Sequence, residues 1–290
     1  MTFIGILVAL ALERLLGHYL VWQLPGLIVT YARGLMRLVP VARLWRSWAA
    51  PLVLIVPSLV LVYELHGMIV SPIVDLLWSA GILLLCLGPR DLSEDVHALL
   101  AAHAAGDAQA EATLARALQA GPHADASHRT LIGALFIQSH ERLFGVLLWF
   151  FALGPMGAVL YRFASRLPRL LNEVEPDSQA ARVAETLQDL LAWIPARITA
   201  LLYGLAGSLD DAIKAWRALA LRHDHPWRTG TWAVLAEVPA ASLGMELAEG
   251  GTVVPATLDA ALHEVLRMQL RALLILLAGF AIFATGLLMQ

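Results

Sequence analysis

Long apolar runs separated by shorter polar stretches organise this chain. Residues 187–207 form the most informative run, LQDLLAWIPARITALLYGLAG. At about 1.5 Å of rise per residue, a helix of this length crosses the roughly 30 Å hydrocarbon core of a bilayer. The pattern therefore predicts a membrane-spanning helix around which other helices pack.

Similar runs occur along the rest of the chain. We expect one helix over residues 2–21, then a span and a return span separated by Ser71-Pro72, and a last span near the end of the chain. The runs behind these predictions are residues 2–21, 51–70, 73–87, 131–138, 143–161 and 272–289. Together they predict an all-α, polytopic membrane helix bundle with about five or six membrane-embedded helices.

Two polar regions interrupt the apolar pattern. Residues 91–105 and 108–120 predict two helices separated by Gly106-Asp107, within an αα-hairpin insertion at 89–130. Residues 208–256 predict an amphipathic segment, whose helix at 209–222 is typical of one lying on a membrane surface. We place both regions on the cytoplasmic side of a single membrane domain, residues 1–290.

The distribution of arginines bears on orientation. Residues 22–48 interleave arginine with tryptophan, which indicates an interfacial, cytoplasmic segment. Arg162, Arg166 and Arg169 then conflict with simple alternation of the spans. Either these arginines lie outside, or residues 143–161 dip into the membrane and return, with the break at Gly154-Pro155.

Composition agrees with a membrane location. Of the 290 residues, 59% are hydrophobic and only 15% are charged, whereas soluble domains are about one quarter charged. The formal net charge of −3 gives no support for nucleic-acid binding. A single cysteine, Cys86, excludes a disulfide framework and a four-cysteine zinc site.

Charged residues inside the 187–207 run are the main functional signal. Asp189, Trp193 and Arg197 follow one another at intervals of four, so they climb one side of the helix as a drifting stripe. The Trp193 ring can stack on the Arg197 guanidinium. Pro195 removes a backbone donor and crowds the carbonyl of Leu191, so we expect a kink there. Such charges either make structural contacts in the bundle or mark a functional site.

We predict a polar intramembrane cavity in which Arg197 holds a small anionic ligand. The residues assigned to ligand binding are Glu13, His140, Glu141, Asp189, Trp193 and Arg197. No nucleotide-binding, hydrolase or metalloprotease motif occurs, so no catalytic residue is assigned. Neither the Glu64, His66 and Asp75 group nor the 223–225 His-Asp-His run is assigned as a metal site, and no cofactor is predicted.

Two stretches resemble a known family. One is SHERLF at 139–144 followed by LLWFFALGPMGAVLYR at 147–162, and the other is LLAWIPARITALLYGL at 190–205. These stretches are similar to the AmpE family of bacterial inner (cytoplasmic) membrane proteins associated with β-lactamase induction. The resemblance implies a multi-pass inner-membrane location and a sensory or regulatory role in cell-wall recycling. A more distant resemblance is to the CobD/CbiB family, the adenosylcobinamide-phosphate synthases.

Two departures separate the chain from the synthase pattern. That family carries an E-N-[TS]-x-D-G-like motif where this chain has SHERLF, and an H-x-S-P-N-x-G-like loop where residues 225–230 read HPWRTG. The AmpE resemblance therefore implies a non-catalytic regulator. The alternatives are a CobD/CbiB-like synthase and a membrane scaffold whose helix at 209–222 recruits a cytoplasmic protein partner.

Overall fold

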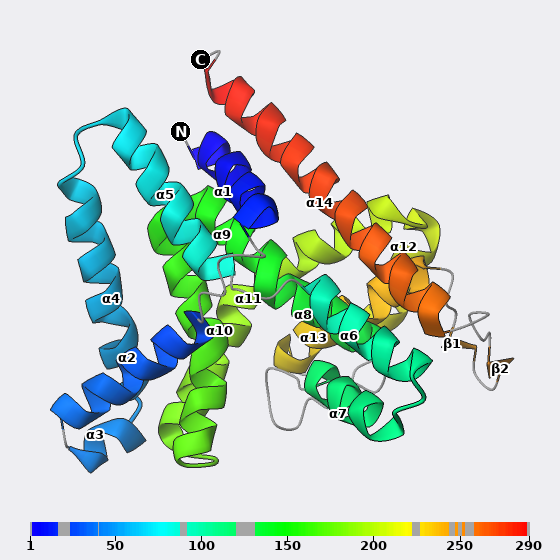
Figure 1. The fold of residues 1–290 in the computed structure, drawn as a ribbon, viewed down its shortest axis with the longest axis horizontal. Helices are drawn as coiled ribbons and strands as arrows, with labels where there is room; N and C mark the ends of the chain where they lie inside the picture. Colours follow the sequence, from blue (N-terminus) through cyan, green and yellow to red (C-terminus); the bar gives the residue numbers. More distant parts are fainter. Residues whose placement is uncertain are drawn as a thin grey trace. The chain divides into compact units, whose positions relative to one another are not determined.

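The computed structural model describes residues 2–16, 24–39, 41–87, 92–119, 131–221, 227–243, 247–248, 251–252 and 258–288. Apart from turns and one pair of two-residue strands, the described residues are helical (Figure 1). The all-α prediction is confirmed. The chain forms two compact units, which are described separately below.

The first unit comprises Met1–Pro89 and Gly145–Leu191. Within it, α5 packs against α1, and α10 packs against α4, α5 and α9. Its helices are α1 (Thr2–Leu16), α2 (Leu24–Leu38), α3 (Ala42–Arg46), α4 (Ala50–Gly67), α5 (Pro72–Leu87), α9 (Gly145–Leu153), α10 (Pro155–Val174) and the first part of α11 (Gln179–Ala206).

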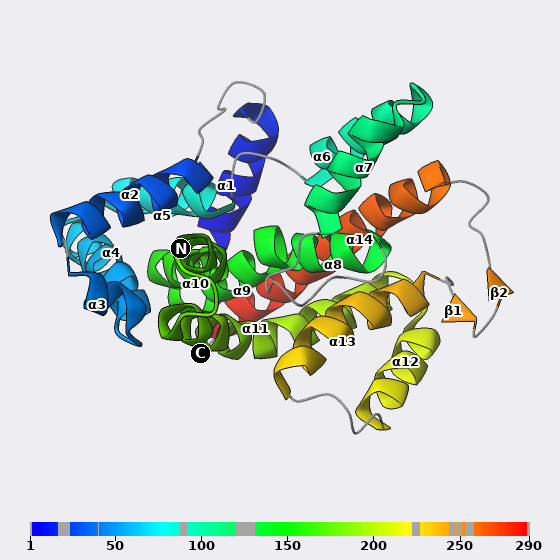
Figure 2. The same cartoon turned by 90° about the horizontal axis from the view of Figure 1, so that it is seen from below.

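The second unit comprises Arg90–Phe144 and Ala192–Gln290. The expected αα-hairpin is present, because α6 packs along α7, and α12 and α13 form a second helix pair (Figure 2). Its elements are α6 (Leu92–Ala104), α7 (Ala108–Gln119), α8 (Leu131–Ser139), the π-helix η1 (His140–Phe144), the last part of α11, α12 (Leu209–Leu221), α13 (Trp227–Ser242), β1 (Leu247–Ala248), β2 (Gly251–Thr252) and α14 (Leu258–Leu288).

Among the described residues, 5 helical segments are long and apolar enough to cross a membrane. This finding agrees with the predicted multi-pass membrane protein. The segments are Ala50–Gly67, Pro72–Ala104, Leu131–Leu153, Gln179–Ala206 and Asp259–Gly286. The end predicted for the first helix, at residue 21, lies outside the described residues.

The 143–161 run is not one straight helix. Gly154 has a φ of 65°, a left-handed conformation that glycine adopts without strain, and Pro155 starts the next helix. A Cβ on Gly157 would meet the Trp149 carbonyl, and one on Gly145 would meet the Tyr161 ring. These two contacts are symmetric about the turn, so α9 and α10 form a tight antiparallel hairpin.

The polar region after this hairpin is shorter than its composition indicates. Residues 172–184 are polar and acidic, which is typical of a loop, but α10 continues to Val174 and α11 begins at Gln179. The amide of Asn172 donates a 3.0 Å hydrogen bond to Glu185 Oε1 and so helps to close the connection. The helix that contains residues 187–207 is therefore longer at its N-terminal end than the apolar run.

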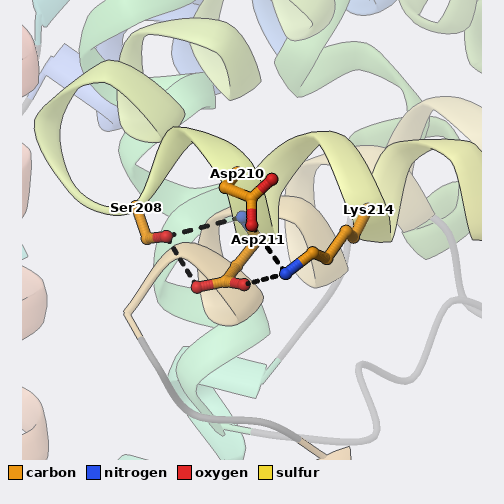
Figure 3. Close-up of polar contacts among 4 residues, drawn as sticks. All are labelled: Ser208, Asp210, Asp211 and Lys214. Atoms are coloured by element: carbon orange, nitrogen blue, oxygen red, sulfur yellow. Dashed lines mark hydrogen bonds and ion pairs between the residues drawn. The ribbon is translucent and has the colours of Figure 1, made fainter.

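Capping side chains fix the start of α12 (Figure 3). The Ser208 hydroxyl donates to Asp211 Oδ2 at 2.6 Å and accepts from the Asp211 backbone N–H at 3.4 Å. Lys214 Nζ lies 2.6 Å from Asp210 Oδ2 and 3.2 Å from Asp211 Oδ1. Serine before a helix and acids in its first turn satisfy free N–H groups and the helix dipole.

Candidate functional site

Four consecutive polar side chains are buried where α8 passes into η1. Gln138, Ser139, His140 and Glu141 are each no more than 4% exposed, although they lie inside the apolar segment Leu131–Leu153. Burying polar groups in apolar surroundings costs free energy unless they find partners. A π-helical turn is rare and occurs often at functional sites. We call these four residues the buried polar segment.

A hydrogen-bond chain joins His140 to α11. The Thr199 hydroxyl donates to the Pro195 carbonyl at 2.8 Å, and its oxygen lies 2.9 Å from His140 Nδ1. Thr199 has one hydroxyl proton, and a carbonyl oxygen only accepts. His140 Nδ1 must therefore carry a proton and donate to Thr199. In the neutral ring this leaves the lone pair on Nε2.

A second bond, roughly one helical turn further along α11, joins the end of α8 to α11. The Tyr203 hydroxyl donates to Ser139 Oγ at 2.8 Å. The Tyr203 ring packs edge-to-face on Phe136 and Phe144, with centroids 4.7 Å and 5.4 Å away. Ser139, His140 and Tyr203 are all buried. The polar contacts are thus enclosed by aromatic rings and isolated from solvent.

Trp193 and Arg197 occupy a different face of α11. The Arg197 guanidinium lies 4.1 Å from the Trp193 ring centroid, so the expected stacking is present, and Nη1 donates to the Trp193 carbonyl at 2.8 Å. Trp193 is 40% exposed, and exposed apolar side chains such as Ile194 and Leu201 share this face. Among the described residues, no carboxylate is paired with Arg197.

The carbonyl that Pro195 leaves without a helical donor finds another donor within the first unit. Pro195 has no N–H to give to the carbonyl four residues earlier, which belongs to Leu191. The Trp149 indole N–H donates to that Leu191 carbonyl at 3.0 Å. The backbone acceptor that the sequence analysis identified is therefore satisfied by a side chain from α9.

The structure divides the predicted site residues between the two units. Glu13, partly buried in α1, and Asp189, buried in α11, belong to the first unit, and each has an interaction partner. His140, Glu141, Trp193 and Arg197 belong to the second unit. Trp193 and Arg197 contact each other, whereas His140 binds Thr199 on the buried face of α11, away from Arg197.

Sequence reasoning missed Thr199, Ser139 and Tyr203. Helical periodicity offered a signal for Thr199, since it lies on the face marked by Ala192, Ala196 and Ala200, all buried. Arg162 was used only to infer orientation, yet it is 4% exposed in α10. It is a further buried charge, located in the first unit.

In the part of the chain that the structure describes, metal-ligating side chains do not gather in groups large enough for a three-ligand metal site. No three histidine, cysteine, aspartate or glutamate side chains come together there. At the tip of the α4–α5 hairpin, His66 Nδ1 lies 3.3 Å from Asp75 Oδ1, a pair rather than a three-residue site. The 223–225 His-Asp-His run lies outside the described residues.

Comparisons with known proteins cover nearly the whole chain. The family model "Regulatory signalling modulator protein AmpE" matches residues 1–284. The chain is 27% identical over 258 residues to Protein AmpE of Shigella flexneri, which covers 85% of this chain and 87% of that protein. It is also 28% identical over 258 residues to the cobalamin biosynthesis protein CobD of Chromobacterium violaceum, covering 84% and 80%.

A shorter similarity, 32% over 87 residues, is to the cobalamin biosynthesis protein CobD of Stutzerimonas stutzeri, and it covers 30% of this chain and 29% of that protein. No solved structure matches the chain.

Proposed function

Because the chain belongs to the AmpE family of regulatory signalling modulators, we propose that it is a non-catalytic regulator in the bacterial inner membrane. It links β-lactamase induction to cell-wall recycling by binding a small anion within the membrane region. Arg197 receives the anion, and the buried polar segment is part of the element that responds.

The observation that carries this proposal is the buried polar segment itself. Polar and ionisable groups inside apolar spans are costly and usually functional. Here they lie at the junction of α8 and the π-helix η1, with His140 and Glu141 in η1, and two hydrogen bonds connect them to α11, the helix that carries Arg197. A change in the position of α11 would therefore alter the hydrogen bonds of His140 and Ser139.

Arg197 supports an anionic ligand. Its guanidinium is positioned by Trp193 through stacking and one hydrogen bond, while the remaining N–H groups have no carboxylate partner among the described residues. A guanidinium matches carboxylate and phosphate oxygens with two parallel hydrogen bonds. The ligand chemistry is thus a carboxylate or phosphate, from either a soluble molecule or a lipid headgroup.

The test uses Arg197→Gln, with Arg182→Gln as the control on the same helix, where Arg182 is exposed. In cells with an inducible β-lactamase and the native gene deleted, we expect Arg182→Gln to restore wild-type induction and Arg197→Gln to fail. Equal restoration by both variants, at equal membrane amounts, would exclude the role of Arg197.

A binding measurement separates the two sources of the anion. Protein in nanodiscs of phosphatidylcholine is titrated with inorganic phosphate, and tryptophan fluorescence is followed because Trp193 stacks on Arg197. A soluble ligand predicts a response to phosphate that Arg197→Gln loses. A lipid ligand instead predicts a response when phosphatidylglycerol is added to the nanodisc. No Arg197-dependent response in either arm would contradict the proposal.

The second candidate function is a cobalamin-pathway synthase, favoured by the similarity to proteins named CobD. Against it, the synthase-like polar motif is replaced by SHERLF at 139–144, of which His140 and Ser139 are bound to α11. Complementation decides between the two: restoration of cobalamin synthesis in a strain lacking that synthase would establish the enzyme and reject the non-catalytic role.

A further inference from the structure

Two histidines from distant parts of the chain meet on the surface of the second unit. His97 on α6 and His263 on α14 stand edge-to-face with ring centroids 6.0 Å apart and planes at 85°. Both side chains are exposed, and the two helices are in contact. Neither residue belongs to the site described above.

The hydrogen bonds of both rings use the same nitrogen, Nδ1, and leave Nε2 available. His97 Nδ1 lies 2.6 Å from the Ser93 carbonyl, and His263 Nδ1 lies 2.8 Å from the Asp259 carbonyl. Since carbonyl oxygens only accept, each Nδ1 carries the proton and each neutral ring has its lone pair on Nε2. Metal-binding histidines typically donate their other N–H to a backbone carbonyl or carboxylate in this way.

The spacing suits a shared metal ion. With a metal–nitrogen distance of about 2.1 Å, two imidazoles on one ion have centroids roughly 5–6.5 Å apart. From this geometry we propose that His97 and His263 bind one divalent transition-metal ion through their Nε2 atoms and clamp α6 to α14. Water fills the remaining positions, because no third ligating side chain joins the pair among the described residues.

The donor atoms of the two histidines indicate which class of metal ion they bind. Imidazole nitrogen favours Zn²⁺, Ni²⁺ and Cu²⁺ over Mg²⁺ and Ca²⁺, which prefer oxygen ligands. The neighbouring carboxylate of Glu264 is paired with Arg267 and Arg271, at 3.4 Å and 3.3 Å. Among the described residues no carboxylate joins the two rings as a third ligand, so the donors of the pair are imidazole nitrogens, and a site of this kind selects a transition metal.

The clamp would act on an element that also contacts the buried polar segment. Asp95, two residues before His97 on α6, forms a 2.7 Å ion pair with Arg142 of η1, and Arg142 Nε donates to Gln138 at 3.2 Å. Metal binding would thus fix the helix on which η1 rests. The site stands independently of the proposed anion binding.

The experiment uses the full chain, purified in detergent with a tag free of histidine and stripped of metal. Titration with Zn²⁺ against a chromophoric chelator should give one micromolar site. We expect His97→Ala and His263→Ala each to weaken binding at least tenfold. His103→Ala should not, since His103 is exposed on the same helix but has its Nδ1 on Glu111, 3.1 Å away. Unchanged binding in either of the first two variants would overturn the proposal.

A second measurement uses the wild-type protein, so its result does not depend on whether the histidine variants fold. Diethylpyrocarbonate modifies accessible imidazole nitrogens, and mass spectrometry locates the adducts. Zn²⁺ should protect His97 and His263 while leaving His103 reactive. Equal modification of all three with and without Zn²⁺ would overturn the proposal and leave His97 and His263 as an edge-to-face ring pair only.

Discussion

Thr199 shows how much one hydroxyl can determine. It accepts from His140 Nδ1 and donates to the Pro195 carbonyl, in a place where it is fully buried. Thr199→Val keeps the shape but leaves the His140 N–H without this acceptor. An unsatisfied buried donor costs about 1–3 kcal/mol, so we expect a loss of that size in denaturant unfolding in detergent.

Thr199→Ser is the matched control, because it retains the hydroxyl and loses one methyl group. It should be more stable than Thr199→Val, even though serine is the more polar residue. If the two variants unfold at the same denaturant concentration, the hydrogen bond to His140 contributes nothing to stability.

At the residue scale, the sequence predicted contacts between side chains close together on one helix. The stacking of Arg197 on Trp193 follows from a spacing of four residues on one helix. His140 and Thr199 are 59 residues apart in the sequence, and Ser139 and Tyr203 are 64 apart. Both pairings therefore depend on how α8, η1 and α11 pack. The charge on Arg197 marked the helix, but it did not indicate which face of α11 receives the polar partners.

The hairpin of α9 and α10 depends on two glycines that allow close approach. In Gly157→Ala, the new Cβ meets the Trp149 carbonyl, which is backbone and cannot rotate away. Overpacking of this kind costs about 1–3 kcal/mol or more. We expect less folded protein after detergent extraction and a lower melting temperature.

Gly81→Ala on α5 provides the comparison. A Cβ at Gly81 has no neighbour within 4 Å, and alanine is favoured over glycine in a helix by up to about 1 kcal/mol. This variant should be at least as stable as the wild type. If Gly157→Ala has the same melting temperature as Gly81→Ala, the tight packing of α9 on α10 is refuted.

The start of α12 should respond to pH through Asp211. The Ser208 hydroxyl and then the Lys214 ammonium hold the pKa of Asp211 below its ordinary value, and pairing with Asp210 and Asp211 raises the pKa of Lys214. The stabilisation from Asp211 is therefore complete above the ordinary carboxyl pKa and is lost as pH falls through the lowered one. The contribution of Lys214 is lost only at high pH, above its raised pKa.

Hydrogen exchange measures this effect on α12 directly. At neutral pH, Asp211→Asn should lower the protection factors of the first-turn amides relative to wild type. Below the lowered pKa of Asp211 the difference should vanish, since the side chain at position 211 is then uncharged in both the wild type and the variant. Asp259→Asn, in the first turn of α14, should leave α12 unchanged. A difference that persists in acid would assign the effect to shape rather than charge.

For the whole molecule, apolar length located most of the candidate spans, and the turn residues located the break at Gly154, which ends the candidate Leu131–Leu153 inside the predicted 143–161 run, and the αα-hairpin. These features are written in contiguous residues and follow from helix rise and backbone sterics. The division into two units could not be read in the same way, because the chain enters each unit twice. The pair His97 and His263 is another product of that return, since α6 meets α14 only in the folded chain.

Membrane sidedness provides a test at the same scale. The contact of α6 with α14 requires the 89–130 insertion and the start of α14 to lie on one side of the bilayer. We expect that side to be the cytoplasm, because residues 22–48, two predicted spans before the insertion, are rich in arginine. With Cys86 replaced by serine, a cysteine at Ala101 on α6 or Ala218 on α12 should therefore react with an impermeant thiol reagent only after cell disruption.

A cysteine at Val70 serves as the opposite case. Val70 is 95% exposed and follows α4, the first of the 5 candidate spans, so it should be labelled in intact cells. Because Cys86 is the one native cysteine and is replaced by serine in these variants, each label reports the introduced cysteine alone. Labelling of Ala101→Cys and Ala218→Cys from opposite sides would reject a shared cytoplasmic location. The two substituted residues lie in one compact unit, so a single rearrangement of a loop could not account for such a result.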